Sequence, residues 1–282
     1  MTGTQTNLDE REIKRQVREF YDRVGWQEIS DGLFQNARYE DLRPVSQEYI
    51  HRAHLRVKRH LAPSGRLLLD AGSGPIQYPE YLEYSAGYHK RVCADLSITA
   101  LQAARKRIGG KGLFVVADVT RLPFASDVFD GVVSLHTIHH VPEGEQVTGY
   151  RELYRVLAPG RSAAVVNGWG DAPLDTFFVK LTELIKRVRG AAEEKDHLPQ
   201  EKTMGRGTFV KKRGYRELRQ ALSGYFPIDI YVWRTLGTHF LRFYIREPWA
   251  GRFWLKVLYR VEELFPRFFG KHGRYPLIVF SK

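Results

Sequence analysis

The sequence predicts an α/β fold in which helices cover both faces of a parallel sheet. Between residues 65 and 169, short apolar runs alternate with longer amphipathic segments, the order expected of repeated β-α units. The apolar runs lack a polar alternation, so the predicted strands are buried on both faces. Hydrophobic residues make up 43% of the 282-residue chain, which suffices for a globular core.

Local signals support the individual elements. The helix over 97–110 begins at Ser97, a good N-cap, and ends at two glycines, while the helix over 145–160 ends at a Pro-Gly pair. In chain order the predicted elements are helices over 9–24 and 46–65, a strand over 65–72, a helix over 76–85, a strand over 90–95, a helix over 97–110, strands over 112–119 and 129–136, a helix over 145–160 and a strand over 161–169.

The rhythm changes after residue 170. We expect a long helix over 172–189, a polar, charged loop over 190–214 and a short helix over 215–224. Two β-rich stretches, 227–237 and 274–282, complete the predicted sheet.

Charge and cysteine content narrow the class of protein. The net charge of +12 and the pI of about 9.7 favour anionic partners, such as nucleic acid, an acidic lipid surface or phosphorylated substrates. Cys93 is the only cysteine, so no internal disulfide can form. The first residues are polar, and no apolar run approaches the ~18 residues of a membrane span. We therefore expect a soluble, cytoplasmic protein.

A glycine turn and three acids at strand ends predict a nucleoside cofactor. Gly72 and Gly74 follow the first strand and let a ligand approach the backbone. Asp95 ends the second strand, where a carboxylate accepts ribose hydroxyls, and Asp118 follows the third, where it can accept from an adenine amino group. Asp70 would repel a pyrophosphate but attract an ammonium and a sulfonium. This favours S-adenosylmethionine over NAD, and the Tyr-x-x-x-Lys pair of short-chain dehydrogenases is missing from the sequence.

Four strings resemble the successive motifs of one family: LLLDAGSGP, CADLS, ADVTRLPFASDVFDGVVSLHTIHHV and ELYRVLAPG. They look like class I S-adenosylmethionine-dependent methyltransferases, in the type 11-like branch that includes the ubiquinone/menaquinone-biosynthesis C-methyltransferases. The resemblance covers roughly residues 46–168. It implies a Rossmann-like seven-stranded methyltransferase sheet with a β-hairpin end and helical cap insertions.

The resemblance also implies a set of cofactor-binding residues. They are Asp70, Gly72 and Gly74 at the methionine end, Asp95 at the ribose, Leu96 against the adenine, Asp118 and the Val119 N–H at the adenine edge, and His136 over the cofactor. One position departs from the family pattern: Ile76 stands where a further glycine is usual, and its Cβ narrows the approach of a ligand. The structural alternatives are that the acids cap helices or form turns and that the glycines serve only a tight turn.

The segment SLHTIHHVP, after the fourth strand, offers a base for the acceptor's proton. His136, His139 and His140 are the candidates, because imidazole titrates near neutrality. The alternative is a packed or capping histidine in a site that needs no base. No metal site is predicted. Tyr21, Tyr39 and Trp169 are candidates for closing over the site, or ordinary core and surface aromatics.

Some acceptors are disfavoured. Methylation of exocyclic base amines typically uses an (Asp/Asn)-Pro-Pro-(Tyr/Phe) turn after the fourth strand, where this chain has SLHT. Methylation of pyrimidine C5 needs a nucleophilic cysteine, and Cys93 lies inside a predicted strand. The net positive charge is therefore the only observation that supports a nucleic-acid substrate.

The C-terminal insertion carries a basic amphipathic helix. Trp249, Phe253, Val257 and Val261 recur at i+4, as do the basic residues Arg252, Lys256 and Arg260. Such a helix can lie in an anionic lipid interface, cap an apolar acceptor pocket, dock on the domain or form a homodimer.

These observations give a provisional domain division and function. Residues 1–64 form helices that cover the cofactor site, and 65–282 form the methyltransferase domain with insertions at 170–214, a candidate lid, and 238–274. We expect methyl transfer to a small, apolar or lipid-linked acceptor by a protein that associates peripherally with membranes. The alternatives are an RNA or other nucleic-acid methyltransferase and a non-catalytic, cofactor-binding partner subunit.

Overall fold

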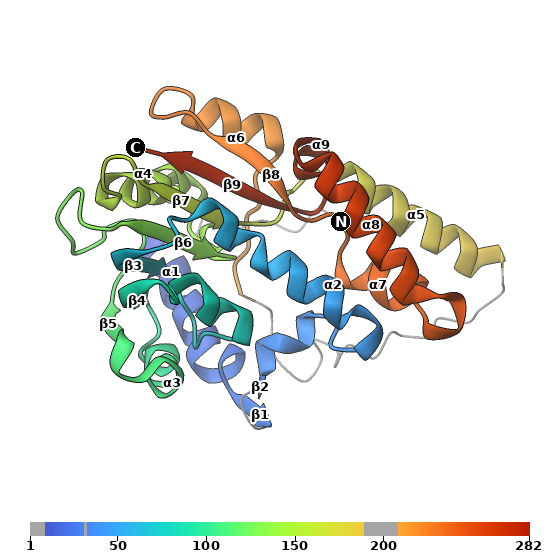
Figure 1. Ribbon diagram of the computed structural model, residues 1–282, viewed down its shortest axis with the longest axis horizontal. Coiled ribbons are helices and arrows are strands. Elements are labelled where there is room, and N and C mark those ends of the chain that lie inside the picture. Colours follow the sequence, from blue (N-terminus) through green and yellow to red (C-terminus); the bar gives the residue numbers. More distant parts are fainter. Residues whose placement is uncertain (1–8, 31–32, 189–207) are drawn as a thin grey trace.

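A seven-stranded sheet organises the computed structural model, which describes residues 9–30, 33–188 and 208–282. The strand order is β5-β4-β3-β6-β7-β9-β8, with β9 antiparallel to both neighbours and the other pairs parallel (Figure 1). The strands are β3 (Gly65–Ala71), β4 (Tyr88–Asp95), β5 (Gly112–Val116), β6 (Gly131–Leu135), β7 (Ser162–Val166), β8 (Asp229–Arg234) and β9 (Tyr275–Ser281). The predicted fold class is confirmed, and a small antiparallel pair, β1 (Glu28–Ser30) with β2 (Leu33–Phe34), lies outside this sheet.

Helices pack on both faces of the sheet, as the apolar strands require. Leu153 and Leu222 bring two helices into the core on one face, and Leu101 brings a third onto the other, where Val57 and Tyr84 of two short turns also pack. The helices are α1 (Glu10–Phe20), α2 (Pro44–Leu55), α3 (Ile98–Ile108), α4 (Gln146–Val156), α5 (Pro173–Val188), α6 (Tyr215–Leu222), α7 (Thr238–Tyr244), α8 (Gly251–Leu264) and α9 (Pro266–His272).

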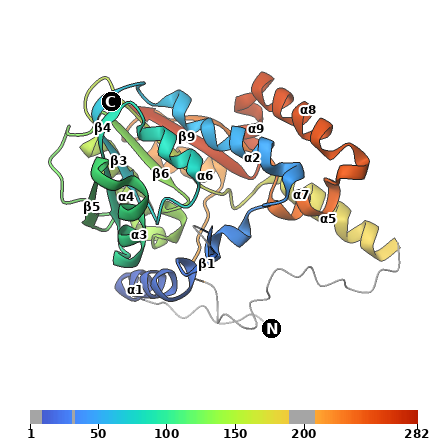
Figure 2. The ribbon, with the colours of Figure 1, turned by 60° about the horizontal axis from the view of Figure 1, so that its bottom comes forward.

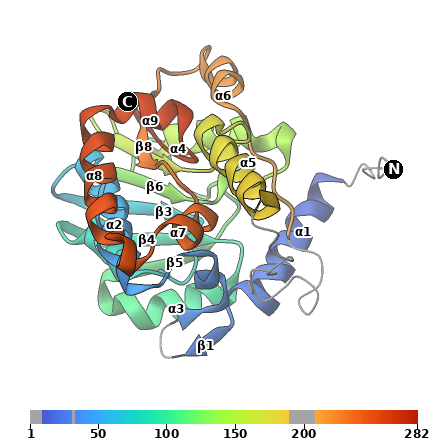
Figure 3. The ribbon, with the colours of Figure 1, turned by 90° about the vertical axis from the view of Figure 1, so that its right-hand side faces the viewer.

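Helices from the N-terminal region and from both insertions form a lobe beside the sheet. Figures 1 and 2 both show α2, α5, α7 and α8 grouped together, away from β3, β4 and β5. Figure 3 looks onto this lobe and shows α7 between α8 and α5. Within the described ranges, no helix combines the length and the apolar character needed to cross a membrane. Most of the predicted 190–214 loop, residues 190–207, lies outside the described part of the chain.

Several predicted boundaries shift. The predicted α-helix over 76–85 is wrong: a 3-10 helix over Pro79–Ser85 takes its place. The turn before it holds Gly72, Gly74 and Ile76 at φ 74°, 55° and 57°, all in the left-handed region, so a right-handed helix cannot begin at residue 76. The helix predicted over 9–24 continues past α1 as a π-helix over Tyr21–Gly25.

The C-terminal amphipathic helix docks through a face other than its predicted apolar stripe. Leu255 and Tyr259 of α8 are buried, whereas Trp249 and Phe253 are 55% and 58% exposed. Polar contacts explain this choice, because buried Glu262 accepts a hydrogen bond from Tyr49 of α2 at 2.8 Å. The i+4 stripe therefore remains on the surface.

Ile76 occupies a backbone conformation that normally favours glycine. Its side chain is fully buried in the core beside α3, and it does not line the cavity described below. The left-handed conformation costs a β-branched residue roughly 1–2 kcal/mol, which the burial of its side chain offsets. The departure from the family's glycine therefore leaves the approach to the turn open.

We expect that shortening the side chain of Ile76 reverses the usual order of stability, so that the glycine variant is more stable than the alanine variant. Ile76→Gly should destabilise the protein by about 1 kcal/mol less than Ile76→Ala, because glycine relieves the left-handed strain that alanine keeps. At buried Leu101, inside α3, glycine should instead cost about 1 kcal/mol more than alanine. Urea unfolding of the four variants measures both differences. The same order at both positions would contradict the strained conformation of Ile76.

Candidate active site

One cavity of about 710 Å³ lies at the carboxyl ends of the parallel strands. Its walls come from α1 and residues 21–26, the glycine turn after β3, the ends of β4 and β6, the segment 208–212, the end of β8 with the start of α7, and the start of β9. All eight residues that the sequence predicts around a cofactor line this cavity, and so do His139 and His140.

The two glycines of the turn are required by their neighbours. A Cβ on Gly72 would lie 2.1 Å from Thr137 Oγ1, and one on Gly74 would lie 3.1 Å from the Trp26 ring. Both residues also have positive φ. The turn is therefore a narrow, side-chain-free cradle, as close approach of a ligand demands.

Asp95 fixes this cradle. Its carboxylate accepts hydrogen bonds from the backbone N–H groups of Gly74 and Ser97, both at 2.8 Å. The predicted N-cap is also present, because Ser97 Oγ accepts from Ala100 N at 3.0 Å. Burial raises the pKa of Asp95 to about 6. Each carboxylate oxygen keeps a second lone pair, so the residue can hold the turn and still accept from ribose hydroxyls.

Asp70 has a partner that the sequence did not predict. Its Oδ2 accepts from the Nε and Nη2 atoms of Arg91 on the neighbouring strand β4, and both side chains are buried. Arg91 also donates to the carbonyl of Tyr81. The Arg91 guanidinium therefore largely balances the charge of this carboxylate beside the cradle.

Asp118 combines turn formation with an ion pair. Its Oδ1 accepts from the Thr120 N–H and hydroxyl at 2.8 Å, and its Oδ2 lies 2.7 Å from Nζ of Lys14 on α1. Lys14 also contacts Glu145 at 2.5 Å. Leu96 and Val119 line the cavity beside this pair. Through Lys14, α1 is held across the end of the cavity where an adenine is expected.

The three histidines differ in how many of their ring nitrogens have a hydrogen-bond partner. His140 uses both, because Nδ1 donates to the Phe209 carbonyl and Nε2 accepts from the Tyr21 hydroxyl, each at 2.8 Å. His139 Nδ1 donates to Asn167 Oδ1 at 3.2 Å, which leaves Nε2 as an acceptor. These tautomers follow from the partners, since a carbonyl can only accept. His140 is thus held in place by both nitrogens, whereas His139 keeps Nε2 free.

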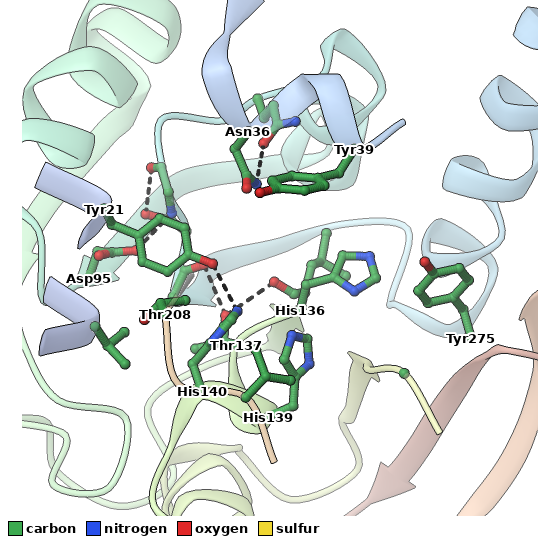
Figure 4. A pocket seen from close by; sticks show the side chains of 18 of the residues that line it. Tyr21, Asn36, Tyr39, Asp95, His136, Thr137, His139, His140, Thr208 and Tyr275 are labelled. Atoms are coloured by element: carbon green, nitrogen blue, oxygen red, sulfur yellow. Dashed lines mark hydrogen bonds between the residues drawn. The ribbon is translucent and has the colours of Figure 1, made fainter. Parts of the chain in front are cut away.

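His136 faces the other end of the cavity. Its backbone adopts φ 56°, and its ring meets Trp233 and Tyr275 edge-on at centroid distances of 5.0 and 5.5 Å. No described residue makes a hydrogen bond to its ring nitrogens. Figure 4 shows the histidines between Tyr21 on one side and Tyr275 on the other.

Burial keeps these imidazoles neutral. Burial and then the charge of Arg234 lower the pKa of His136 to about 3, and burial lowers that of His140 to about 4. Burial and the neighbouring His140 lower the pKa of His139 well below its usual range. All three are therefore unprotonated at neutral pH, the form that can accept a proton.

Aromatic rings form much of the remaining wall. Tyr21 stacks on Trp26 with a centroid distance of 4.9 Å, and Tyr21 and Tyr39 both line the cavity, as predicted. Trp169 does not: it is 4% exposed in the core, and its Nε1 donates to the Gly270 carbonyl at 2.7 Å. Of the two alternatives for Trp169, the structure shows the ordinary core aromatic, because the chain turns after β7 toward α9.

Sequence reasoning missed several residues of the site. Arg234 at the end of β8 and Glu40 form a buried ion pair in the wall. Although burial opposes ionisation, Arg234 and His54 hold the pKa of Glu40 well below its usual range. Asn167 directly follows β7, so its place at a carboxyl strand end could have indicated a role. Lys212 gave no local signal.

Nothing in the structure supports Cys93 as a nucleophile. The thiol is buried within β4, and burial raises its pKa to about 12. Among the described residues, no group of three or more histidine, cysteine, aspartate or glutamate side chains is placed to hold a metal ion.

Known proteins share the central part of this chain. Residues 69–165 match the family described as "Methyltransferase domain", type 11. Methyltransferase GfsG of Streptomyces halstedii is 28% identical over 167 residues, which cover 55% of this chain and 58% of that protein. The demethylmenaquinone methyltransferase of Clavibacter sepedonicus is 39% identical over 105 residues, 36% of this chain and 41% of that protein. The chain thus spans about half the length of these relatives.

The fold is shared more widely. A phosphoethanolamine N-methyltransferase of Haemonchus contortus, solved in complex with S-adenosyl-L-methionine, superposes with a TM-score of 0.53 at 15% identity, covering 94% of this chain and 60% of that one. At this identity the likeness shows the fold alone.

Sheet order, glycine cradle and strand-end acids define a class I S-adenosylmethionine-dependent methyltransferase domain. Within that class, residues 69–165 match the type 11 methyltransferase family. The cofactor of this domain is S-adenosylmethionine, and the bare cradle at Gly72 and Gly74 with Asp95 beside it fits that molecule.

We expect cofactor affinity to fall in acid with a midpoint near the pKa of Asp95. Ribose hydroxyls donate to the ionised carboxylate, so protonation through pH 6 should weaken binding of S-adenosylhomocysteine by about tenfold between pH 7 and pH 5. Calorimetry of the wild type and of Asp95→Asn measures this. The variant should bind weakly with a flat profile, whereas Asp127→Asn, at a surface ion pair with Lys282, should keep the wild-type profile. A flat wild-type profile would contradict the assignment.

Proposed function

We propose that this chain transfers a methyl group from S-adenosylmethionine to a small, largely apolar acceptor, with His139 as the base. One observation carries the proposal: a single cavity joins the glycine cradle to a chamber walled by Trp233, Tyr275 and the neutral histidines. A methyl donor held at Gly72 and Gly74 and an acceptor held in that chamber would share one enclosed space.

In this proposal each site residue has a definite task. Asp70, Gly72 and Gly74 hold the methionine end of the cofactor, and Asp95 holds its ribose. Leu96, Asp118 and Val119 surround its adenine. When bound, S-adenosylmethionine supplies an electrophilic methyl group whose bond to sulfur breaks as the acceptor's lone pair attacks, leaving S-adenosylhomocysteine.

The proton released by the acceptor needs a destination. His139 Nε2 is unprotonated, and Asn167 holds the ring by accepting from Nδ1–H. Asn167 is itself held, because its Nδ2 donates to the Tyr150 hydroxyl at 2.9 Å. This chain of contacts orients the base without adding a negative charge. His136 bounds the acceptor chamber, and His140 positions Tyr21.

Replacing His139 should therefore separate catalysis from binding. We expect His139→Gln to lower turnover by roughly 10²- to 10⁴-fold while S-adenosylhomocysteine affinity changes less than about threefold. His51→Gln, at a surface pair with Glu80, is the matched control and should retain full turnover. Conversion of S-adenosylmethionine to S-adenosylhomocysteine is measured with a quinol, a fatty acid, a phenol and bulk tRNA in separate reactions. Equal loss of binding and turnover in His139→Gln would assign the residue to structure alone.

The same assay tests the alternatives. Turnover with tRNA only would identify a nucleic-acid methyltransferase. Cofactor binding without turnover on any acceptor would support a non-catalytic partner subunit.

The surface of α8 supports a lipid-linked source for the acceptor. Phe253 and Trp254 of α8 and Trp249, which precedes the helix, are each more than half exposed, and Arg252 and Lys256 of α8 form ion pairs with Glu247 and Glu48 on the same surface. Exposed aromatics interleaved with cations suit the headgroup region of an anionic bilayer. In a flotation assay the wild type should rise with phosphatidylglycerol vesicles. The variant in which all three aromatics become serine should stay at the bottom of the gradient. Failure to float would remove the lipid part and leave methyl transfer intact.

A further inference from the structure

Main-chain contacts hold the segment 208–214 against the loop that carries His136, His139 and His140, here called the histidine loop. The Lys211 N–H donates to the His139 carbonyl at 2.8 Å, and the Phe209 carbonyl accepts from His140 at 2.8 Å. Gln146 donates to the Lys211 carbonyl at 2.8 Å, and Gly170 N–H donates to the Arg213 carbonyl at 3.1 Å. The backbone around residue 212 is therefore fixed on both sides.

This fastening directs Lys212 into the acceptor chamber. The residue lines the cavity, and its side chain lies over Gly168: a Cβ built there would be 3.0 Å from Lys212 Cε and 3.1 Å from Nζ. A larger residue at 168 would displace the lysine. The charge of Lys212 acts on His136 and on His139, so the ammonium lies within electrostatic range of both.

Lys212 has no partner in the part of the chain that the structure describes. No carboxylate or carbonyl there accepts a hydrogen bond from its Nζ. Asp175, the acid whose charge acts on Lys212, is already paired with Arg274. Its sequence neighbour Lys211 points outward and pairs with Glu143 at 3.0 Å.

A half-buried, unpartnered ammonium is costly unless a ligand supplies its counter-charge. Burial, followed by the charge of Arg274, lowers the pKa of Lys212, which agrees with a cation held without a partner. The other walls nearby are aromatic, namely Trp233 and Tyr275. The chamber thus offers apolar surface and an ammonium that lacks a carboxylate partner among the described residues.

We infer that Lys212 binds an anionic oxygen, of a carboxylate or an ionised phenol, on the acceptor that enters the histidine chamber. The inference rests on the proposed function and specifies the class of its substrate. Lys212 is a binding residue in this arrangement: it donates to the anionic oxygen, and the aromatic walls hold the apolar remainder.

Binding of paired probes tests the inference. Decanoate is compared with decanamide, and 4-nitrophenolate with 4-nitroanisole, by calorimetry at pH 8. Within each pair the apolar part is closely similar, and only one member carries the anion. We expect wild-type protein to prefer at least one anion over its neutral partner by about 10- to 100-fold, the range of a charge-assisted hydrogen bond. Which pair shows the preference tells the carboxylate source from the phenolate source.

Variants assign the preference to one side chain. Lys212→Met should reduce it to less than about threefold, Lys212→Arg should keep most of it, and Lys211→Met, the matched control, should leave it unchanged. Lys212→Gln replaces the methionine variant if that variant does not fold, as judged by circular dichroism. Equal binding of both members of both pairs to the wild type would overturn the inference. So would a preference that survives in Lys212→Met and Lys212→Gln, or one lost equally in Lys211→Met.

The titrations are run with and without S-adenosylhomocysteine, which separates this inference from the proposed function. Failure to bind S-adenosylhomocysteine would defeat the proposed function while the anion preference is still measured. A wild type that binds S-adenosylhomocysteine but shows no anion preference would defeat only the inference.

Discussion

The carboxylate of Asp95 joins the two halves of the cofactor cradle. It accepts from the Gly74 N–H of the turn after β3 and from the Ser97 N–H at the start of α3. Adjacent parallel strands bring these groups to one edge, and a buried acid with two backbone donors fixes their spacing. This one side chain therefore links the bare turn to the start of α3, beside the proposed position of the ribose.

The histidine loop organises the opposite end of the cavity. His140 uses one ring nitrogen to bind Tyr21 and the other to bind Phe209. It therefore links the helical residues after α1 to the segment 208–214. His139, one residue earlier, turns to Asn167 and keeps a nitrogen free. Two adjacent residues of one type thus differ in role because only one of them has a partner for each nitrogen.

The residues proposed to hold the cofactor could be placed at one cavity from the sequence because their positions are set locally. Strand ends, glycines and the Ser97 cap lie in motifs whose spacing fixes their geometry, and all of them reached the cavity. The sequence could not decide between the site and the core for Trp169, because its path depends on α9, about a hundred residues later. The sequence could not decide which face of α8 docks, because periodicity reports only which residues share a face, whereas the buried contact of Glu262 with α2 decides which face docks.

The residues of the proposed acceptor chamber could not be predicted, because they come from distant parts of the chain. Glu40 meets Arg234, and Lys212 reaches the histidines, across long separations in the chain. No spacing rule connects such residues, and their pairing depends on how the insertions fold back. The balanced charge of Asp70 likewise depends on the register of β3 with β4, in which Asp70 lies opposite Cys93 and Arg91 stands two positions earlier.

Ile76 changes how the turn meets its ligand. A glycine there would let the free protein sample many turn shapes, and a ligand would pay to select one. Here a branched side chain, locked into the core, has already excluded those shapes during folding. The conformational entropy lost at this residue therefore lowers the folding stability of the domain and not the affinity for the cofactor. The cofactor meets a turn whose shape is already set.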